Sequence, residues 1–68
     1  MKAYDAEFLD DKNVRCICSV AESNHDKALE KLKRLWTVKK VIRFERSRHL
    51  EVVKSSPEGL DTFKLTYT

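Results

Sequence analysis

The chain has 68 residues, of which 41% are hydrophobic and 37% are charged, and its formal net charge is +3. A chain of this length is expected to hold one domain at most, and its apolar content is too high for an intrinsically disordered chain. Residues 1–68 are therefore expected to fold as a single domain with a heavily charged surface. Because so small a domain buries little surface, a second copy or a partner protein would add useful burial.

No segment has the length and apolar character of a signal peptide or of a membrane span. We therefore expect a cytoplasmic protein that does not cross a membrane. Cys16 and Cys18 lie two residues apart in a predicted strand, so both side chains project from one face, and a bridge between them would strain the backbone. They are expected to be free thiols.

The first third of the chain predicts a β-hairpin. Within residues 2–9, Tyr4, Ala6 and Phe8 alternate with Asp5 and Glu7, which is typical of a strand with one buried face. Residues 14–21 are rich in β-forming residues and predict a second strand. Residues 10–13 (DDKN) are polar and form the predicted turn. In the second strand, Cys16 is predicted to face the buried side and Ile17 the other side.

Residues 23–37 (SNHDKALEKLKRLWT) predict the single helix, with Ser23 as its N-cap. Spacings of one, three and four residues place the apolar side chains in one stripe. That stripe contains Ala28, Leu29, Leu32, Leu35 and Trp36. The opposite face is expected in solvent. It carries Lys27, Glu30, Lys31, Lys33 and Arg34.

Three further strands are predicted at residues 38–46, 49–54 and 60–67, because apolar and polar residues alternate in each. In the first of them Ile42 is predicted to lie on the buried face and Val41 on the opposite face. The pattern therefore changes from the helical period to the strand period within one or two residues after the helix.

Turn signals join these strands into antiparallel pairs, the clearest being residues 55–59 (SSPEG), where Pro57 and Gly59 suit a turn. The order ββαβββ predicts an α+β fold with a single helix packed on one face of a mainly antiparallel five-stranded sheet. A parallel, right-handed crossover through the helix is favoured. The expected core is Tyr4, Phe8, Val14, Cys16, Cys18, Val20, Leu29, Leu32, Leu35, Trp36, Ile42, Phe44, Leu50, Val52, Phe63 and Leu65.

The uncovered face of the predicted sheet carries three aliphatic residues among charged neighbours: Ile17, Val41 and Val53. Such a patch predicts self-association. The alternative interpretation is that these are scattered β-branched residues that favour strands and have no partner.

Charge is unevenly distributed along the chain. Residues 1–26 have a net charge of −3, residues 27–54 of +7 and the remainder of −1. The basic segment 27–54 predicts a surface for phosphate groups or another anion. Its candidate binding residues are Lys31, Arg34, Lys39, Lys40 and Arg43. The alternative is a solvated helix face that serves solubility.

Motifs of sequence-specific nucleic-acid modules are missing. A helix-turn-helix needs a second helix, but the chain predicts only one. Base stacking needs outward aromatic residues, but most of the aromatic residues here are predicted to point inward. Binding to nucleic acid would therefore be directed at the phosphate backbone. Catalytic motifs are also weak. Cys16 or Cys18 with His25 or His49 would be needed for a nucleophile or a zinc site, but the spacing matches no structural zinc motif.

These observations predict a small non-enzymatic binding protein without a metal, a cofactor or a small-molecule substrate. The first hypothesis is a regulatory or inhibitory protein-interaction module that also self-associates as a homodimer. The alternative is a nucleic-acid binding protein that uses the basic segment 27–54. Small accessory and inhibitory proteins, including phage and prophage products, are often of this size and type.

Overall fold

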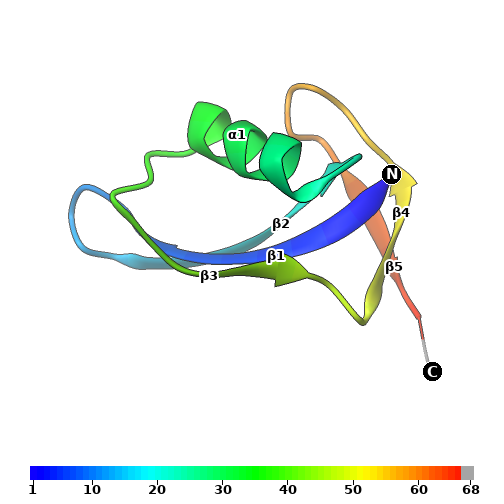
Figure 1. Cartoon of the computed structure of the whole chain (residues 1–68), viewed down its shortest axis with the longest axis horizontal. Helices are drawn as coiled ribbons and strands as arrows, with labels where there is room; N and C mark the ends of the chain where they lie inside the picture. Colours follow the sequence, from blue (N-terminus) through cyan, green and yellow to red (C-terminus); the bar gives the residue numbers. More distant parts are fainter. Residues whose placement is uncertain (67–68) are drawn as a thin grey trace.

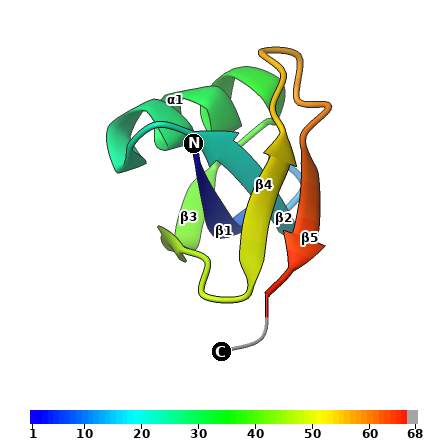
Figure 2. The same cartoon turned by 90° about the vertical axis from the view of Figure 1, so that its right-hand side faces the viewer.

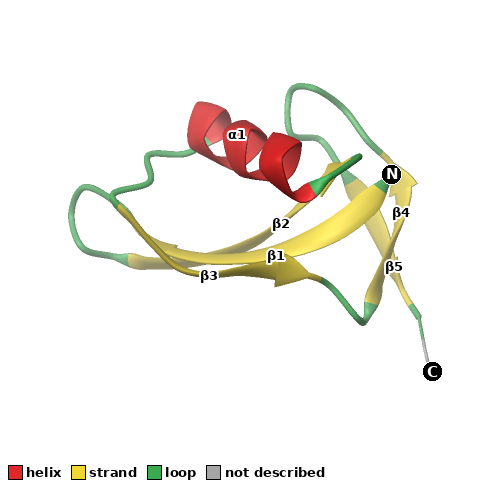
Figure 3. Ribbon diagram, in the orientation of Figure 1, coloured by secondary structure: helices red, strands yellow, loops and turns green. Residues whose placement is uncertain are grey.

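A computed structural model describes residues 1–66 and contains one helix and five strands in the predicted order (Figures 1 and 3). The elements are β1 (Lys2–Leu9), β2 (Arg15–Glu22), α1 (His25–Leu35), β3 (Lys40–Arg46), β4 (Leu50–Lys54) and β5 (Thr62–Leu65). The α+β class is confirmed, but the strands form a three-stranded sheet, β2-β1-β3, and a separate two-stranded sheet, β4-β5. The predicted single five-stranded sheet is therefore wrong. The predicted strand end at Tyr67 lies outside the described residues.

β1 is the central strand of the three-stranded sheet and is antiparallel to both neighbours. β2 and β3 consequently run parallel to each other on either side of it, and α1 connects them. The helix lies across one face of this sheet, here called the helix face, and the other side is called the open face (Figure 1). The predicted hairpin of the first two strands is confirmed.

The helix is shorter than predicted at both ends: it begins at His25 and ends at Leu35. Its N-cap is Asn24, whose side-chain oxygen accepts a hydrogen bond from the backbone N–H of Lys27 at 2.9 Å. Both Ser23 and Asn24 suit an N-cap, so the sequence alone did not separate them. α1 ends at Leu35, and Trp36 is already extended. At 11 residues α1 offers no apolar span, and no helix in the described chain is long and apolar enough to cross a membrane.

The core lies between α1 and the helix face. Its buried side chains are Tyr4, Ala6, Phe8, Val20, Ala28 and Leu32. Half-buried neighbours pack against them, namely Cys16, Cys18, Leu29, Val38 and Phe44. Four side chains predicted to belong to the core are instead exposed: Val14, Trp36, Ile42 and Leu65. Val14 belongs to the turn before β2, and Leu65 lies on the hairpin, which is not part of the sheet that α1 covers.

A β-bulge in β3 explains why Val41 and Ile42 exchange their predicted places. Glu7 pairs with Arg43 and Phe8 pairs with Val41, so Ile42 is the extra residue. Val41 therefore shares the helix face with buried Phe8, and the prediction that it lies on the open face is wrong. Because a bulge breaks the alternation of side chains, Ile42 is left exposed.

The β4-β5 hairpin crosses the end of the three-stranded sheet at which β1 begins (Figures 1 and 2). The chain leaves β3 at Ser47, whose backbone N–H donates to the Ala3 carbonyl at 2.9 Å. The Ser47 hydroxyl accepts from the backbone N–H groups of His49 and Leu50, so the chain turns away instead of forming a hairpin with β3. A bulge in β4 leaves Val53 exposed on this second sheet.

Candidate functional site

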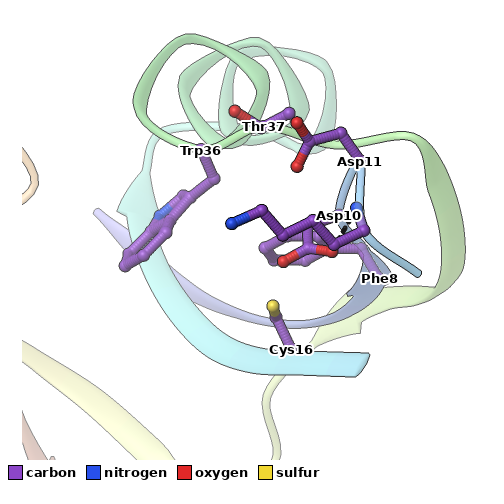
Figure 4. Close-up of a pocket in the computed structure, with 7 residues that line it drawn as sticks. Phe8, Asp10, Asp11, Cys16, Trp36 and Thr37 are labelled. Atoms are coloured by element: carbon purple, nitrogen blue, oxygen red, sulfur yellow. Dashed lines mark hydrogen bonds between the residues drawn. The ribbon is translucent and has the colours of Figure 1, made fainter. Parts of the chain in front are cut away.

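An open cavity of about 320 Å³ lies where the turn between β1 and β2 meets the end of α1 (Figure 4). We call it the end cavity. Its lining residues are Phe8, Asp10, Asp11, Lys12, Cys16, Trp36 and Thr37. Buried Phe8 and the sulfur of Cys16 form the apolar part, and the turn residues form a charged rim. The volume is near the lower end of the range of ligand pockets, roughly 300–1,000 Å³.

Trp36 reaches this cavity because the helix stops one residue before it. Its backbone N–H donates to the Leu32 carbonyl at 2.9 Å, but its dihedral angles are those of an extended residue. The Trp36 ring packs against the Phe8 ring, with the two ring centroids 6.5 Å apart, and half of Trp36 remains exposed. The sequence missed this site because a helix continuing to Thr37 would have kept Trp36 in the apolar stripe.

The rim of the cavity is built by turn chemistry. One carboxylate oxygen of Asp10 accepts hydrogen bonds from the backbone N–H groups of Lys12 and Val14, both at 2.9 Å. Asn13 adopts a positive φ of 61°, which asparagine tolerates better than most residues. Asp11 and Lys12 are exposed, so the rim presents both signs of charge to a ligand.

The two cysteines are free thiols that both lie on the helix face of β2. Figure 4 shows the sulfur of Cys16 pointing into the end cavity between Trp36 and Phe8. Burial raises the pKa of the Cys18 thiol, and the neighbouring Cys16 raises it further. A raised pKa leaves less of the thiolate that a nucleophile requires.

The predicted position of Lys31 on the solvent-exposed face of the helix is wrong. The Lys31 side chain is buried, with an exposure of 3%. Its ammonium donates to both carboxylate oxygens of Asp61 and to the Ala21 carbonyl, each at 3.0 Å. The Asp61 carboxylate also accepts from the backbone N–H groups of Ala21 and Ser56. This buried pair, the Lys31–Asp61 clamp, joins α1 and β2 to the loop before β5.

Opposing effects act on the pKa of Asp61. Burial by itself raises it, but hydrogen bonds from Ser56, Ala21 and Lys31, together with the lysine charge, outweigh burial and hold the pKa below its usual value. The carboxylate is therefore ionised at neutral pH, and Lys31 is not available to bind a phosphate group.

The remaining candidate anion-binding residues do not all lie on one surface. Arg34 donates to the Pro57 carbonyl at 2.8 Å, and Lys39 donates to the Asn13 side chain at 3.1 Å. Arg43 lies on the open face, where it pairs with Glu7 and Glu45. Lys40, exposed at the start of β3, pairs with Leu9 and so lies on the open face with Arg43, whereas Lys39 lies beside the turn that contains Asn13.

The open face is mainly a charged network. Glu7, on the central strand, lies between Arg15 and Arg43 and makes an ion pair with each. Ile17, the cross-strand partner of Glu7 on β2, is 68% exposed, as predicted. The predicted patch of Ile17, Val41 and Val53 is not formed, because Val41 faces the helix and Val53 belongs to the other sheet.

Neither histidine lies with the cysteines. The His25 ring packs edge-on against Phe44, at a centroid distance of 5.0 Å, and His49 is exposed in the connection before β4. Among residues 1–66, no three His, Cys, Asp or Glu side chains are grouped as metal ligands would be. Comparison of the chain with protein-family models, with curated proteins and with solved structures found no match in any of the three.

Proposed function

We propose that this chain is a small non-enzymatic protein-interaction module that binds a partner protein through the end cavity. The observation that carries the proposal is the half-exposed indole of Trp36 above an apolar floor. Tryptophan is the residue most enriched at binding hot spots, where it gains most by becoming fully buried. In the free chain this ring leaves apolar surface in water that a ligand would cover.

The shape and charge of the cavity indicate one anchoring side chain of a partner. Phe8 and Trp36 offer apolar contacts, and Asp10 and Asp11 place carboxylates at the rim beside Lys12. A peptide with one large apolar residue next to a basic residue would match both features.

Selection from a displayed random-peptide library tests the proposal. Trp36 is the single tryptophan of the chain, so its fluorescence reports binding to the wild-type protein directly. Selected peptides are expected to share an apolar anchor, to shift this emission, and to lose about 30-fold or more in affinity for Trp36→Ala, as is typical of a hot spot. Val53→Ala, an exposed change on the other sheet, is the control. Peptides that bind Trp36→Ala as well as wild type would overturn the proposal.

A second candidate function is binding of single-stranded nucleic acid at the same end of the chain. It is supported by Lys12 in the cavity lining and by Lys39, which is hydrogen-bonded to Asn13 of the adjoining turn. Lysines beside an exposed aromatic ring suit phosphate contacts combined with base stacking. Titration with a thymidine oligonucleotide would then quench Trp36 in low salt and lose the effect in high salt. An unchanged emission in low salt would exclude this function.

A further inference from the structure

We propose that this chain forms a symmetric homodimer in which the free outer edges of two β2 strands pair antiparallel, with the two Ile17 residues facing each other at the twofold axis. β2 is an edge strand of the three-stranded sheet (Figure 2). The proposal uses the backbone edge of β2 and does not depend on the end cavity, although Cys16 belongs to both. It rests on which outward backbone groups of β2 have no hydrogen-bond partner among residues 1–66, and on the charges beside them.

The hydrogen bonds of Ala21 fix the direction in which the backbone groups of β2 point. Its N–H donates to Asp61 and its carbonyl accepts from Lys31, so both groups point away from β1. In an antiparallel pair this direction alternates from one residue to the next. The N–H and carbonyl groups of Arg15, Ile17 and Ser19 therefore also point outward, whereas those of the residues between them pair with β1.

Both ends of this free edge are closed, and this selects one register. At one end the groups of Ala21 are already used by the Lys31–Asp61 clamp. At the other end Asn13 has a positive φ and belongs to the turn. Pairing about Ile17 sets Arg15 opposite the partner's Ser19 and uses every outward group of the three residues. A shift in either direction brings Ala21 or the turn into the ladder and loses hydrogen bonds.

The charges on the open face are complementary in this register. Ser19 is flanked in its own sheet by Asp5 and then Glu45, whereas Arg15 is flanked by Leu9 and then Lys40. Pairing Ser19 with the partner's Arg15 therefore continues an acidic row of one copy into a basic row of the other. The twofold axis repeats this arrangement, so two such rows are formed. Complementary charge across an interface favours one orientation over others.

Ile17 adds an apolar contact at the axis. It is 68% exposed in the single chain, and directly paired residues on one sheet face pack their side chains together. The opposite edge strand, β3, is less suited to pairing with a second copy. A bulge interrupts it, and four of its seven residues are charged. Bulges and charges are features that protect a sheet edge against pairing.

The register also places cysteines of the two copies together. Cys16 lies opposite the partner's Cys18 in a pair that is not hydrogen-bonded, for which the Cα atoms are about 4.5 Å apart. Disulfides form across Cα separations of about 4.4–6.8 Å. Diamide, which takes two electrons and two protons from each pair of thiols, should therefore link the two chains. Cys16 does not face the partner's Cys16, nor Cys18 the partner's Cys18.

This pattern gives a test of both the dimer and its register. Wild-type protein treated with diamide at mildly alkaline pH is expected to run as a linked dimer on a non-reducing gel. Cys16→Ser and Cys18→Ser, each treated separately, are expected to remain monomers on the gel. An equimolar mixture of the two variants is expected to link again, because each supplies the cysteine that the other lacks. Linkage within either variant treated separately, or no linkage in the mixture, would overturn the proposal.

Sedimentation of the reduced protein at up to about 1 mM tests the same dimer without cysteine chemistry, over a range that suits a small interface. Ile17→Lys removes the apolar contact and sets like charges against each other, and it should weaken the dimer about tenfold or more. Ile42→Lys, at the exposed bulge of β3, is the matched control and should leave association unchanged. A monomer at every concentration, or equal effects of both variants, would contradict pairing through β2.

Discussion

The sharpest prediction for stability concerns the Lys31–Asp61 clamp, tested by replacing Lys31 with methionine. Methionine keeps much of the length of the buried stem but removes the ammonium. Asp61 would then keep its two backbone donors, from Ala21 and Ser56, and lose its counter-ion. The Ala21 carbonyl would lose the hydrogen bond that it now accepts from Lys31.

The expected loss is large for a chain of this size. Both side chains are only 3% exposed, so solvent screens the pair little, and removing one partner of such a pair typically costs about 3–5 kcal/mol. A domain of 68 residues has a free energy of unfolding of roughly 3–10 kcal/mol. The single change should therefore remove a substantial part of the stability or unfold the chain outright.

Urea unfolding followed by circular dichroism measures the effect. Lys33→Met, an exposed change on the same helix, is the matched control and should alter the free energy of unfolding by less than about 0.5 kcal/mol. Asp61→Asn, which keeps an acceptor but removes the charge, should have an intermediate effect and remain measurable if Lys31→Met does not fold. If Lys31→Met matched Lys33→Met, the clamp would contribute nothing and its assignment as a structural pair would be wrong.

Three further predictions concern acid stability, the core and a turn. The pKa of Asp61 is below its ordinary value of 3.8, so the ionised carboxylate stabilises the fold above pH 3.8, and this stabilisation is lost as the pH falls through the lowered pKa. The difference in melting temperature between wild type and Asp61→Asn should therefore shrink in acid. Leu32→Ala, at a fully buried position, should lower the free energy of unfolding by about 2–5 kcal/mol in urea. Gly59→Ala should lower the melting temperature, because φ is 85° there and an added Cβ would lie 2.9 Å from Leu35 Cδ1, whereas Glu58→Ala beside it should not.

The elements that the sequence predicts best are those with an unbroken local pattern. Residues 4–8 alternate strictly between apolar and acidic side chains, and the predicted bounds, residues 2–9, are those of β1 in the structure. The helix was also predicted, within two residues at each end, from the spacing of Ala28, Leu32 and Leu35. In both cases short-range periodicity decides the structure, and residues far along the chain change little.

Apart from the exact ends of the helix, the main errors come from interactions between distant residues. The bulge that exchanges Val41 and Ile42 depends on pairing with Glu7 and Phe8, which no pattern within β3 reveals. Lys31 follows Ala28 by three residues and so borders the apolar stripe, but its partner Asp61 is 30 residues away. A lysine beside an apolar stripe is a weak signal of burial, because most such lysines keep their ammonium in water.

The same nonlocal contacts connect the fold to the proposed binding surfaces. Because Lys31 and Asp61 hold the backbone of Ala21, they close one end of the free β2 edge, while the turn at Asn13 closes the other. An edge limited in this way can add one short strand in one register and cannot extend into a long ladder. Unlimited edge pairing is the route to aggregation, so a closed edge permits association while restricting its extent. Lys31, predicted from the sequence to lie on a phosphate-binding surface, would thus instead help to fix the register of the proposed dimer.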